Sequence, residues 1–253
     1  MLKHRVIPCL LLKNGGLVKT QKFKDPKYVG DPINVIRIFN DKEVDELIVL
    51  DIEASKAHRE PNYELIEQFA GECFMPLCYG GGISTVEQAK RLFSLGVEKI
   101  CIQTRALADL QLIRDIADRY GNQSVVVSVD IKKNLLASYR LYSSSSGKML
   151  DEPWRDFLNK VVAAGAGEIM LTAVDRDGTL SGMDLSLIRA ATQSCPVPVI
   201  AAGGAATLSD LRAAVDAGAS AIAAGAMFIY YGPHRAVLIT YPNYNDLVSL
   251  LDK

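Results

Sequence analysis

The sequence predicts an α/β protein that folds as one (βα)8 barrel, the TIM-barrel architecture, over residues 1–253. The chain length matches the roughly 250 residues that such a barrel usually needs. Eight short runs rich in β-branched residues alternate with eight longer helical patterns. The runs lack polar alternation, which is typical of parallel strands buried on both faces. A doubly wound open sheet is the alternative arrangement of the same units.

Strands and helices alternate along the whole chain, and no Pro-, Ser- or Gly-rich linker divides it. The predicted strands are Arg5–Leu12, Glu46–Ile52, Pro76–Tyr79, Lys99–Ile102, Ser124–Asp130, Glu168–Thr172, Pro198–Ala202 and Ala221–Ala224. The predicted helices lie near residues 32–41, 61–71, 84–95, 109–120, 153–164, 184–193, 207–217 and 233–251. A long polar loop is expected after the first strand, and Ser143–Gly147 is expected to be a loop.

An internal repeat supports the barrel and divides it into half-barrels of about 1–122 and 123–253. The run from Pro76 to Gly82 recurs 122 residues later as the run from Pro198 to Gly204. The same offset relates Glu46–Leu50 to Glu168–Thr172. Near the start of each half, Pro8–Lys13 aligns with Val127–Lys132 at an offset of 119. Such periodicity indicates two fused (βα)4 units in a single domain.

Composition narrows the classes of function. The 28 Lys and Arg against 29 Asp and Glu give a net charge of −1, whereas nucleic-acid binders carry a basic excess. No apolar run approaches the roughly 18 residues of a membrane span, and the N-terminal stretch is interpreted as a strand rather than a signal peptide. Five cysteines without a CxxC pair favour reduced thiols over zinc. We expect a cytoplasmic protein with no metal, no cofactor and no nucleic-acid or membrane partner.

Two glycine-rich turns are predicted at the barrel mouth, where strand ends and the following loops form the active face. Glycine lets the backbone approach an oxyanion, and the helices that follow these turns offer free N–H groups. A tight turn needing positive φ explains either glycine pair alone, but the repeat of both favours phosphate binding. The predicted phosphate-binding residues are Gly81, Gly82, Gln103, Thr104, Gly203, Gly204, Gly225 and Ala226.

Polar side chains at strand ends are the catalytic candidates. Asp130 follows an apolar run, where a carboxylate must be paired or functional, and a general acid/base role is favoured over a structural one. The other candidates are Lys19, Asp51, Thr172 and Asp177, of which the two acids are equally suited to capping a helix or orienting a loop. The repeat aligns Leu11 with Asp130, so a mechanism with two carboxylates lacks one member.

Several motifs in order resemble the cyclase subunit of imidazole glycerol phosphate synthase over almost the whole chain. They are Arg5–Leu10 with Lys13 and Lys19, Leu50–Ile52, Gly80–Ile83, Val125–Asp130, Gly165–Ile169 and Asp175–Thr179. The similarity fades after Gly225 and in Tyr142–Trp154. The resemblance implies a lyase of histidine biosynthesis whose barrel receives ammonia from a glutaminase on its bottom face. That ammonia then reacts with a bisphosphorylated ribulosyl substrate at the mouth.

The resemblance also implies an ammonia gate at the bottom of the barrel. The family's ring of four charged residues matches Arg5, Glu46, Lys99 and Glu168. Each lies at the start of a predicted strand, where ordinary solubility charges are the alternative. Two acids and two bases on the expected strands favour the gate, because interior charges require pairing.

The departures from this family lie at the mouth. Of the two catalytic carboxylates, Asp130 is kept and Leu11 replaces the other, and one general acid or base commonly contributes about 10²–10⁴-fold. Gln103 stands where asparagine is usual, and Gly225 stands near an expected serine. This combination resembles a paralogous branch associated with surface-polysaccharide, including lipopolysaccharide, genes. There, barrel and glutaminase are thought to form a glutamine amidotransferase complex that supplies ammonia to a third, sugar-amidating protein.

We therefore expect an ammonia-conducting subunit for amidation of a phosphorylated or nucleotide-linked sugar, with very low cyclase turnover of its own. Two alternatives remain. The first is a true cyclase that tolerates Leu11, with Asp130 acting alone or Asp51 substituting. The second is a related phosphoribosyl isomerase, which Leu11 also weakens because that enzyme uses two aspartates at the same positions.

Overall fold

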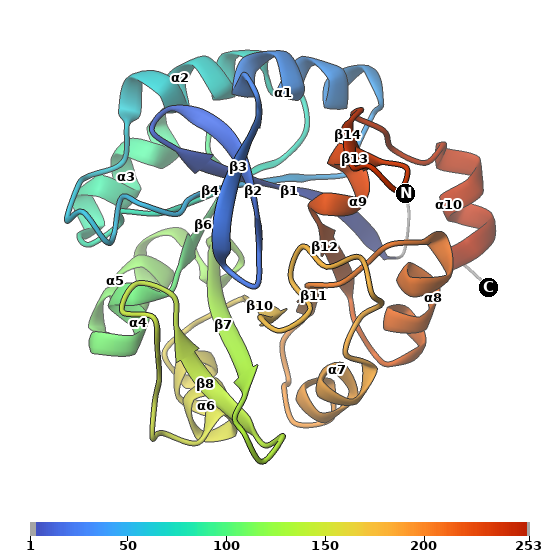
Figure 1. The fold of residues 1–253 in the computed structure, drawn as a ribbon. Coiled ribbons are helices and arrows are strands. Elements are labelled where there is room, and N and C mark those ends of the chain that lie inside the picture. The colour runs from blue at the N-terminus through green and yellow to red at the C-terminus, as the bar shows by residue number, and fades with distance from the viewer. Residues whose placement is uncertain (1–3, 252–253) are drawn as a thin grey trace.

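The computed structural model describes residues 4–251 and shows eight parallel strands closed into a barrel surrounded by helices (Figure 1). The barrel strands are β1 (Arg5–Lys13), β4 (Leu47–Asp51), β5 (Leu77–Gly80), β6 (Lys99–Ile102), β7 (Val125–Lys133), β10 (Glu168–Ala173), β11 (Val199–Ala202) and β12 (Ala221–Ala224). Parallel pairing of β1 with β12, with Arg5 opposite Ala221, closes the barrel. The (βα)8 prediction is confirmed, while residues 1–3 and 252–253 of the predicted half-barrels lie outside the described residues.

The outer layer consists of amphipathic helices whose apolar faces pack on the strands. They are α1 (Pro32–Asp41), α2 (Tyr63–Glu72), α3 (Val86–Ser94), α5 (Gln111–Tyr120), α6 (Trp154–Ala163), α7 (Leu185–Thr192), α8 (Leu208–Asp216) and α10 (Tyr244–Leu251). In α1, for example, the buried Val35, Ile36 and Phe39 recur at helical spacing. Two further short helices, α4 (Thr104–Ala108) and α9 (Ala226–Ile229), follow β6 and β12 directly.

The internal repeat extends to local backbone geometry. Thr85 begins α3 with φ −135° and ψ 160°, and Thr207 begins α8 with φ −133° and ψ 162°. Both form capping boxes, in which the threonine hydroxyl accepts a backbone N–H while the third helical residue reaches back. Gln103 and Gly225, which precede α4 and α9, are also 122 positions apart and have φ of −126° and −111°. Equivalent turns therefore reach equivalent places around the mouth.

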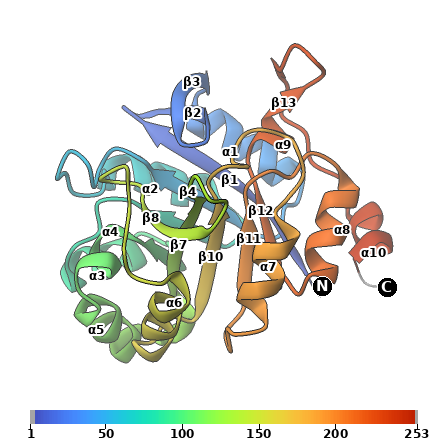
Figure 2. The same cartoon turned by 60° about the horizontal axis from the view of Figure 1, so that its bottom comes forward.

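Two hairpins extend the barrel strands beyond the mouth. β2 (Gly16–Gln21) and β3 (Lys24–Gly30) follow β1, so the expected polar loop after the first strand is wrong and a β-hairpin occupies it. The turn between β1 and β2 is Asn14-Gly15, with φ of 51° and 77°. Asn-Gly between apolar runs favours a type I′ hairpin turn, which is the local signal for this element. Figure 2 shows the β2–β3 hairpin and β13 on the same side of the barrel as α9.

The strand that contains Asp130 is also longer than predicted. β7 runs on to Lys133 and pairs with β8 (Tyr139–Ser143), which pairs in turn with β9 (Lys148–Met149). The expected loop at Ser143–Gly147 is therefore only the turn between β8 and β9. Asp130 lies opposite Tyr142 in the ladder, so its position is held by strands on both sides.

The predicted helix over 233–251 is wrong in its first half. Residues Tyr230–Tyr231 (β13) and Ala236–Val237 (β14) form a small hairpin, and α10 begins only at Tyr244. Pro242 explains the late start, because proline lacks a backbone N–H and restricts the residue before it. The predicted helix over 109–120 is present as α5, which begins at Gln111, and the extended Asp109, with φ of −158°, separates it from the additional short helix α4.

The core has two parts, since strand side chains alternate between the outer and inner faces. Most apolar side chains pack between the strands and the helices. A separate cluster fills the barrel interior and consists of Ile7, Cys9, Ile48, Cys78, Cys101, Val126, Met170, Ile200, Ala202, Ala221 and Ala223. Within residues 4–251, no helix has the length and apolarity needed to cross a membrane.

Candidate functional site

The predicted mouth residues line two adjoining pockets at the carboxyl ends of the strands. The larger pocket contains Leu11, Lys19, Asp130, Thr172, Asp177, Gly203, Gly204, Gly225 and Ala226. The smaller pocket contains Asp51, Gly81, Gly82, Gln103 and Thr104. Leu50 and Ser128 border both, so the two pockets adjoin each other.

Asp130 is a buried carboxyl with no cation bonded to it among the described residues. Its side chain accepts a hydrogen bond from Gln103 Nε2 at 2.6 Å and from Ser128 Oγ at 3.2 Å, and only 3% of the residue is exposed. Burial raises the pKa of Asp130 to about 7, although hydrogen bonds from Gln103, Ser128 and Thr172 act in the opposite direction. Such a carboxyl exchanges its proton near neutral pH, as a general acid or base requires.

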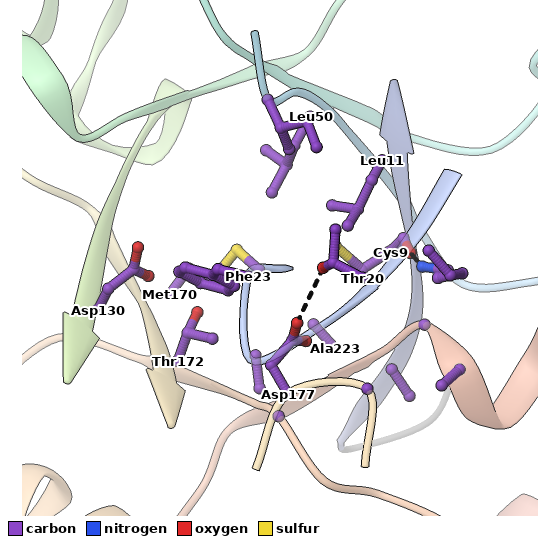
Figure 3. Close-up of a pocket in the computed structure, with 18 of the residues that line it drawn as sticks. Cys9, Leu11, Thr20, Phe23, Leu50, Asp130, Met170, Thr172, Asp177 and Ala223 are labelled. Atoms are coloured by element: carbon purple, nitrogen blue, oxygen red, sulfur yellow. Dashed lines mark hydrogen bonds between the residues drawn. The ribbon is translucent and has the colours of Figure 1, made fainter. Parts of the chain in front are cut away.

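Leu11 faces Asp130 across the pocket (Figure 3). It lies on β1, opposite Leu50 of β4, and is half-buried. Leu11 and Leu50 therefore present aliphatic side chains opposite Asp130. Neither side chain can transfer a proton.

Lys19 and Asp177 are charged residues that line the larger pocket. The Lys19 ammonium is buried and donates a hydrogen bond to the Cys9 carbonyl. Thr20 Oγ1 donates to Asp177 Oδ2 at 3.3 Å, and Lys22 N donates to the Asp177 carbonyl at 2.9 Å. The β2–β3 hairpin is thereby attached to the loop after β10. Burial lowers the pKa of Lys19 and raises that of Asp177, while their opposite charges partly offset both effects.

The glycine turns have positive φ, with 116° at Gly81, 76° at Gly82, 95° at Gly203 and 102° at Gly204. A Cβ at Gly81 or Gly203 would also overlap the backbone carbonyl at the end of the neighbouring strand. Packing alone therefore requires glycine there, whatever the turn binds. Gly82 N donates to Ser55 Oγ at 3.2 Å, so an oxyanion at this turn would replace the serine hydroxyl.

Gln103 and Asp51 are engaged with the protein itself. The Gln103 amide bridges Asp130 and Ser144, because its Nε2 donates to the carboxyl and its Oε1 accepts from Ser144 N at 3.1 Å and from the Ser144 hydroxyl. Asp51 Oδ1 accepts from Glu53 N at 2.9 Å and Ala54 N at 3.0 Å, which orders the loop after β4. The structure thus gives Asp51 a loop-orienting contact rather than a place in the larger pocket.

The mouth contains residues that the sequence did not single out. Phe23 of the hairpin turn and Ser144 of the β8–β9 turn line the larger pocket. Both lie in segments predicted as irregular loops. The local sequence signals near them were the turn residues Asn14-Gly15 and Gly147. Such residues indicate where strands turn, but they do not indicate which side chains come into contact.

At the opposite end of the barrel, the four predicted charges form a closed ring. Arg5 bonds to Glu46 and, at 2.6 Å, to Glu168. Lys99 Nζ lies 3.0 Å from Glu46 and 3.2 Å from Glu168. Burial alone would lower the pKa of Arg5, but the carboxylates of Glu46 and Glu168 outweigh it and raise that pKa.

Between ring and mouth, the interior is apolar or contains neutral thiols. Burial raises the pKa of Cys9 to about 11 and raises those of Cys78 and Cys101 as well. These thiols are therefore protonated at neutral pH. Passage of a charged species along this cluster would require dehydration without a counter-charge.

Comparisons with known proteins identify the family of the chain. A family model described as Histidine biosynthesis protein matches residues 5–235. A Pseudomonas aeruginosa protein, named provisionally as imidazole glycerol phosphate synthase subunit hisF2, is 54% identical over 252 residues, which cover 98% of this chain and 99% of its own. A Vibrio vulnificus protein, named provisionally as subunit hisF3 of the same enzyme, is 44% identical and covers 100% of this chain and 98% of its own. Imidazole glycerol phosphate synthase subunit HisF of Streptococcus sanguinis is 38% identical, with 92% of each chain covered.

Proposed function

The chain belongs to the histidine biosynthesis protein family as a cyclase-like relative of imidazole glycerol phosphate synthase, and on this premise we propose that it delivers ammonia for amidation of a sugar. In this proposal a glutaminase docks on the barrel bottom around the charged ring. Ammonia passes through the interior and leaves at the mouth. The acceptor is a phosphorylated or nucleotide-linked sugar of surface-polysaccharide biosynthesis, amidated with a third protein.

The observation that carries this proposal is Leu11 opposite Asp130. Ring cyclisation by one acid and one base on opposite sides of a substrate needs a proton-transferring group at both positions. The side chain of Leu11 can neither donate nor accept a proton. The mouth therefore keeps anion-binding turns and one carboxyl, but lacks the pair.

The ring and the interior support the ammonia part of the proposal. The ring places two acids and two bases in mutual contact around the barrel entrance. Above it, aliphatic side chains and protonated thiols favour neutral ammonia over ammonium, because an unpaired charge is strongly disfavoured there. A neutral nucleophile is the species that amidation requires.

A true cyclase of histidine biosynthesis is the second candidate, and Asp130 favours it. This carboxyl has a pKa of about 7 and shares a pocket with Lys19 and the turn at Gly203. One carboxyl that alternates between acid and base would then serve both steps of the reaction.

The deciding experiment combines the barrel with its glutaminase and measures two activities. We expect the barrel to stimulate glutamine hydrolysis. With ammonium salts and the bisphosphorylated ribulosyl substrate, we expect turnover about 10²–10⁴-fold below that of an ordinary cyclase. Cyclase turnover within about tenfold of an ordinary enzyme would refute the proposal and favour the second candidate.

Leu11→Asp tests the missing carboxyl directly, and Leu11→Asn is the matched control. The aspartate should raise cyclase turnover because it restores the second proton-transferring group. The asparagine has similar size and polarity but no titratable proton, so it should leave turnover low. Equal responses of the two variants would contradict the missing-acid explanation.

The gate is tested by Lys99→Met, with Lys160→Met as the control. Lys160 also pairs with a glutamate, at 2.7 Å, but on the outer surface of α6. Lys99→Met should change glutamine-dependent product formation more than ammonium-dependent formation. If both activities changed equally, the ring would have only a structural role.

A further inference from the structure

A hollow adjoins the smaller mouth pocket on the side away from the barrel interior. It is formed by the loop after β4, the turn between β5 and α3 with the first turn of α3, and α4, and none of its lining residues belongs to a barrel strand. The smaller pocket and the hollow share the lining residues Ser55, Gly82, Ile83, Thr104 and Arg105. The larger pocket, the smaller pocket and this hollow therefore adjoin one another along a path that leads outward from Asp130.

The hollow is lined by two guanidinium groups. Arg59 from the loop and Arg105 from α4 both contribute to it, together with His58. Over residues 4–251, neither arginine forms an ion pair within 4.0 Å. The Arg105 Nε atom is buried and has no acceptor on the described protein. A buried donor without an acceptor costs about 1–3 kcal/mol, so the geometry favours an acceptor supplied by a ligand.

Glu60 is the acidic residue of this hollow. Its charge acts on the neighbouring helix, because burial and then the Glu60 carboxylate raise the pKa of Tyr63 at the start of α2. With two arginines against one glutamate, the charged side chains of the hollow sum to a net positive charge.

We propose that Arg59 and Arg105 bind the second phosphoryl group of a diphosphate ester whose first phosphoryl group lies at Gly82 and Thr104. A guanidinium binds phosphate oxygens in a planar, bidentate geometry, which suits Arg105 at the junction of the two pockets. A monophosphate would occupy only one of these adjacent positions. A nucleotide-linked sugar fills the whole path, with the sugar toward Asp130 and the nucleoside outside the hollow.

The sugar end of this ligand rests on the proposed function, whereas the diphosphate site does not. Binding is therefore measured apart from ammonia delivery, by calorimetric titration with inorganic phosphate, inorganic pyrophosphate and UDP at low ionic strength. We expect pyrophosphate and UDP to bind at least tenfold more tightly than phosphate. UDP binding tenfold more weakly than pyrophosphate would overturn the ester assignment.

The variants are Arg59→Gln and Arg105→Gln, with Arg114→Gln as the control. Arg114 is exposed on α5 and lies outside the hollow. Each hollow variant should weaken pyrophosphate about tenfold and change phosphate binding less than twofold, while the control changes neither. Arg105→Lys should recover part of the loss, because it restores the charge without the planar fork. Arg59 is exposed, so its variant remains informative even if Arg105→Gln fails to fold.

Two results separate the proposals. If neither arginine variant alters pyrophosphate binding, or if pyrophosphate binds no more tightly than phosphate, the diphosphate site is refuted. Glutamine hydrolysis stimulated by the barrel should be unchanged in the control Arg114→Gln, because Arg114 lies outside both the hollow and the ring. Loss of stimulation in the wild-type complex, with pyrophosphate still bound, would instead refute ammonia delivery alone.

Discussion

Replacing Asp130 by asparagine should stabilise the protein at neutral and alkaline pH. Asparagine has the shape of the protonated carboxyl but never ionises, so it removes the burial of a charge. Gln103 Nε2 and Ser128 Oγ donate to different oxygens of Asp130, so the asparagine oxygen can keep the bond from Gln103 at 2.6 Å while its NH2 group donates to the Ser128 hydroxyl, which rotates to accept. The expected change therefore depends on pH in a way that loss of packing would not.

The magnitude follows from the difference between the folded and ordinary pKa values of Asp130. Burial raises its pKa from 3.8 to about 7, so the folded state holds a proton that the unfolded state has released between these values. The carboxyl thus contributes stability at low pH, and this contribution is lost as pH rises through 7. At about 1.4 kcal/mol for each pKa unit, the full difference is about 4 kcal/mol, and about 3 kcal/mol of it develops between pH 5 and pH 8.

The assay is urea unfolding of wild type and Asp130→Asn at several pH values between 5 and 8. The variant should gain about 3 kcal/mol relative to wild type over this range and then reach a plateau. Asp151→Asn is the control, since Asp151 is exposed and pairs with Arg140 at 3.1 Å. A free-energy difference that is flat with pH, or that falls as pH rises, would refute the raised pKa.

Three further predictions concern the ring, the second-half turn and the helix caps. Glu46→Gln should lower the free energy of unfolding by about 2–3 kcal/mol in urea titrations, because it leaves the half-buried Arg5 and Lys99 to share Glu168 as their carboxylate, and a loss below about 1 kcal/mol would indicate a solvated ring. Gly225→Ala should weaken inorganic phosphate binding about tenfold in calorimetry, because the added Cβ displaces the Lys19 ammonium. Gly71→Ala, where a Cβ meets nothing within 4 Å, should leave that affinity unchanged. Thr85→Ala should cost about 1 kcal/mol in thermal unfolding through loss of the capping box, and an unchanged melting temperature would contradict this.

The barrel itself was predictable because its strands are short, apolar on both faces and separated by helical patterns. The run Val125–Val129 and its neighbours identify buried strands without tertiary information. The repeat then located equivalent turns, and the structure places Gly81 and Gly203 at matching strand ends with similar φ. Strand ends were less predictable, since β7 continues past Asp130 only because β8 pairs with it.

The contacts of the site were not predictable from spacing. Gln103 was expected to bind phosphate, yet its amide bridges Asp130 and Ser144, residues 27 and 41 positions away. Lys19 was placed in a loop, whereas its burial depends on a hairpin that folds back over the mouth. Such arrangements depend on which strands become neighbours when the barrel closes. The Asn14-Gly15 turn was the one local signal for the hairpin.

The charged ring at the bottom of the barrel produces only a weak electrostatic field in the bulk solvent outside this entrance. Arg5, Glu46, Lys99 and Glu168 alternate in sign around the opening, so their monopole and much of their dipole cancel. The remaining quadrupole field falls off steeply with distance, and salt shortens its range further. Such an entrance steers neither ammonium nor carboxylate ions from afar. Any molecule admitted there must be selected at contact, by its fit between the four side chains.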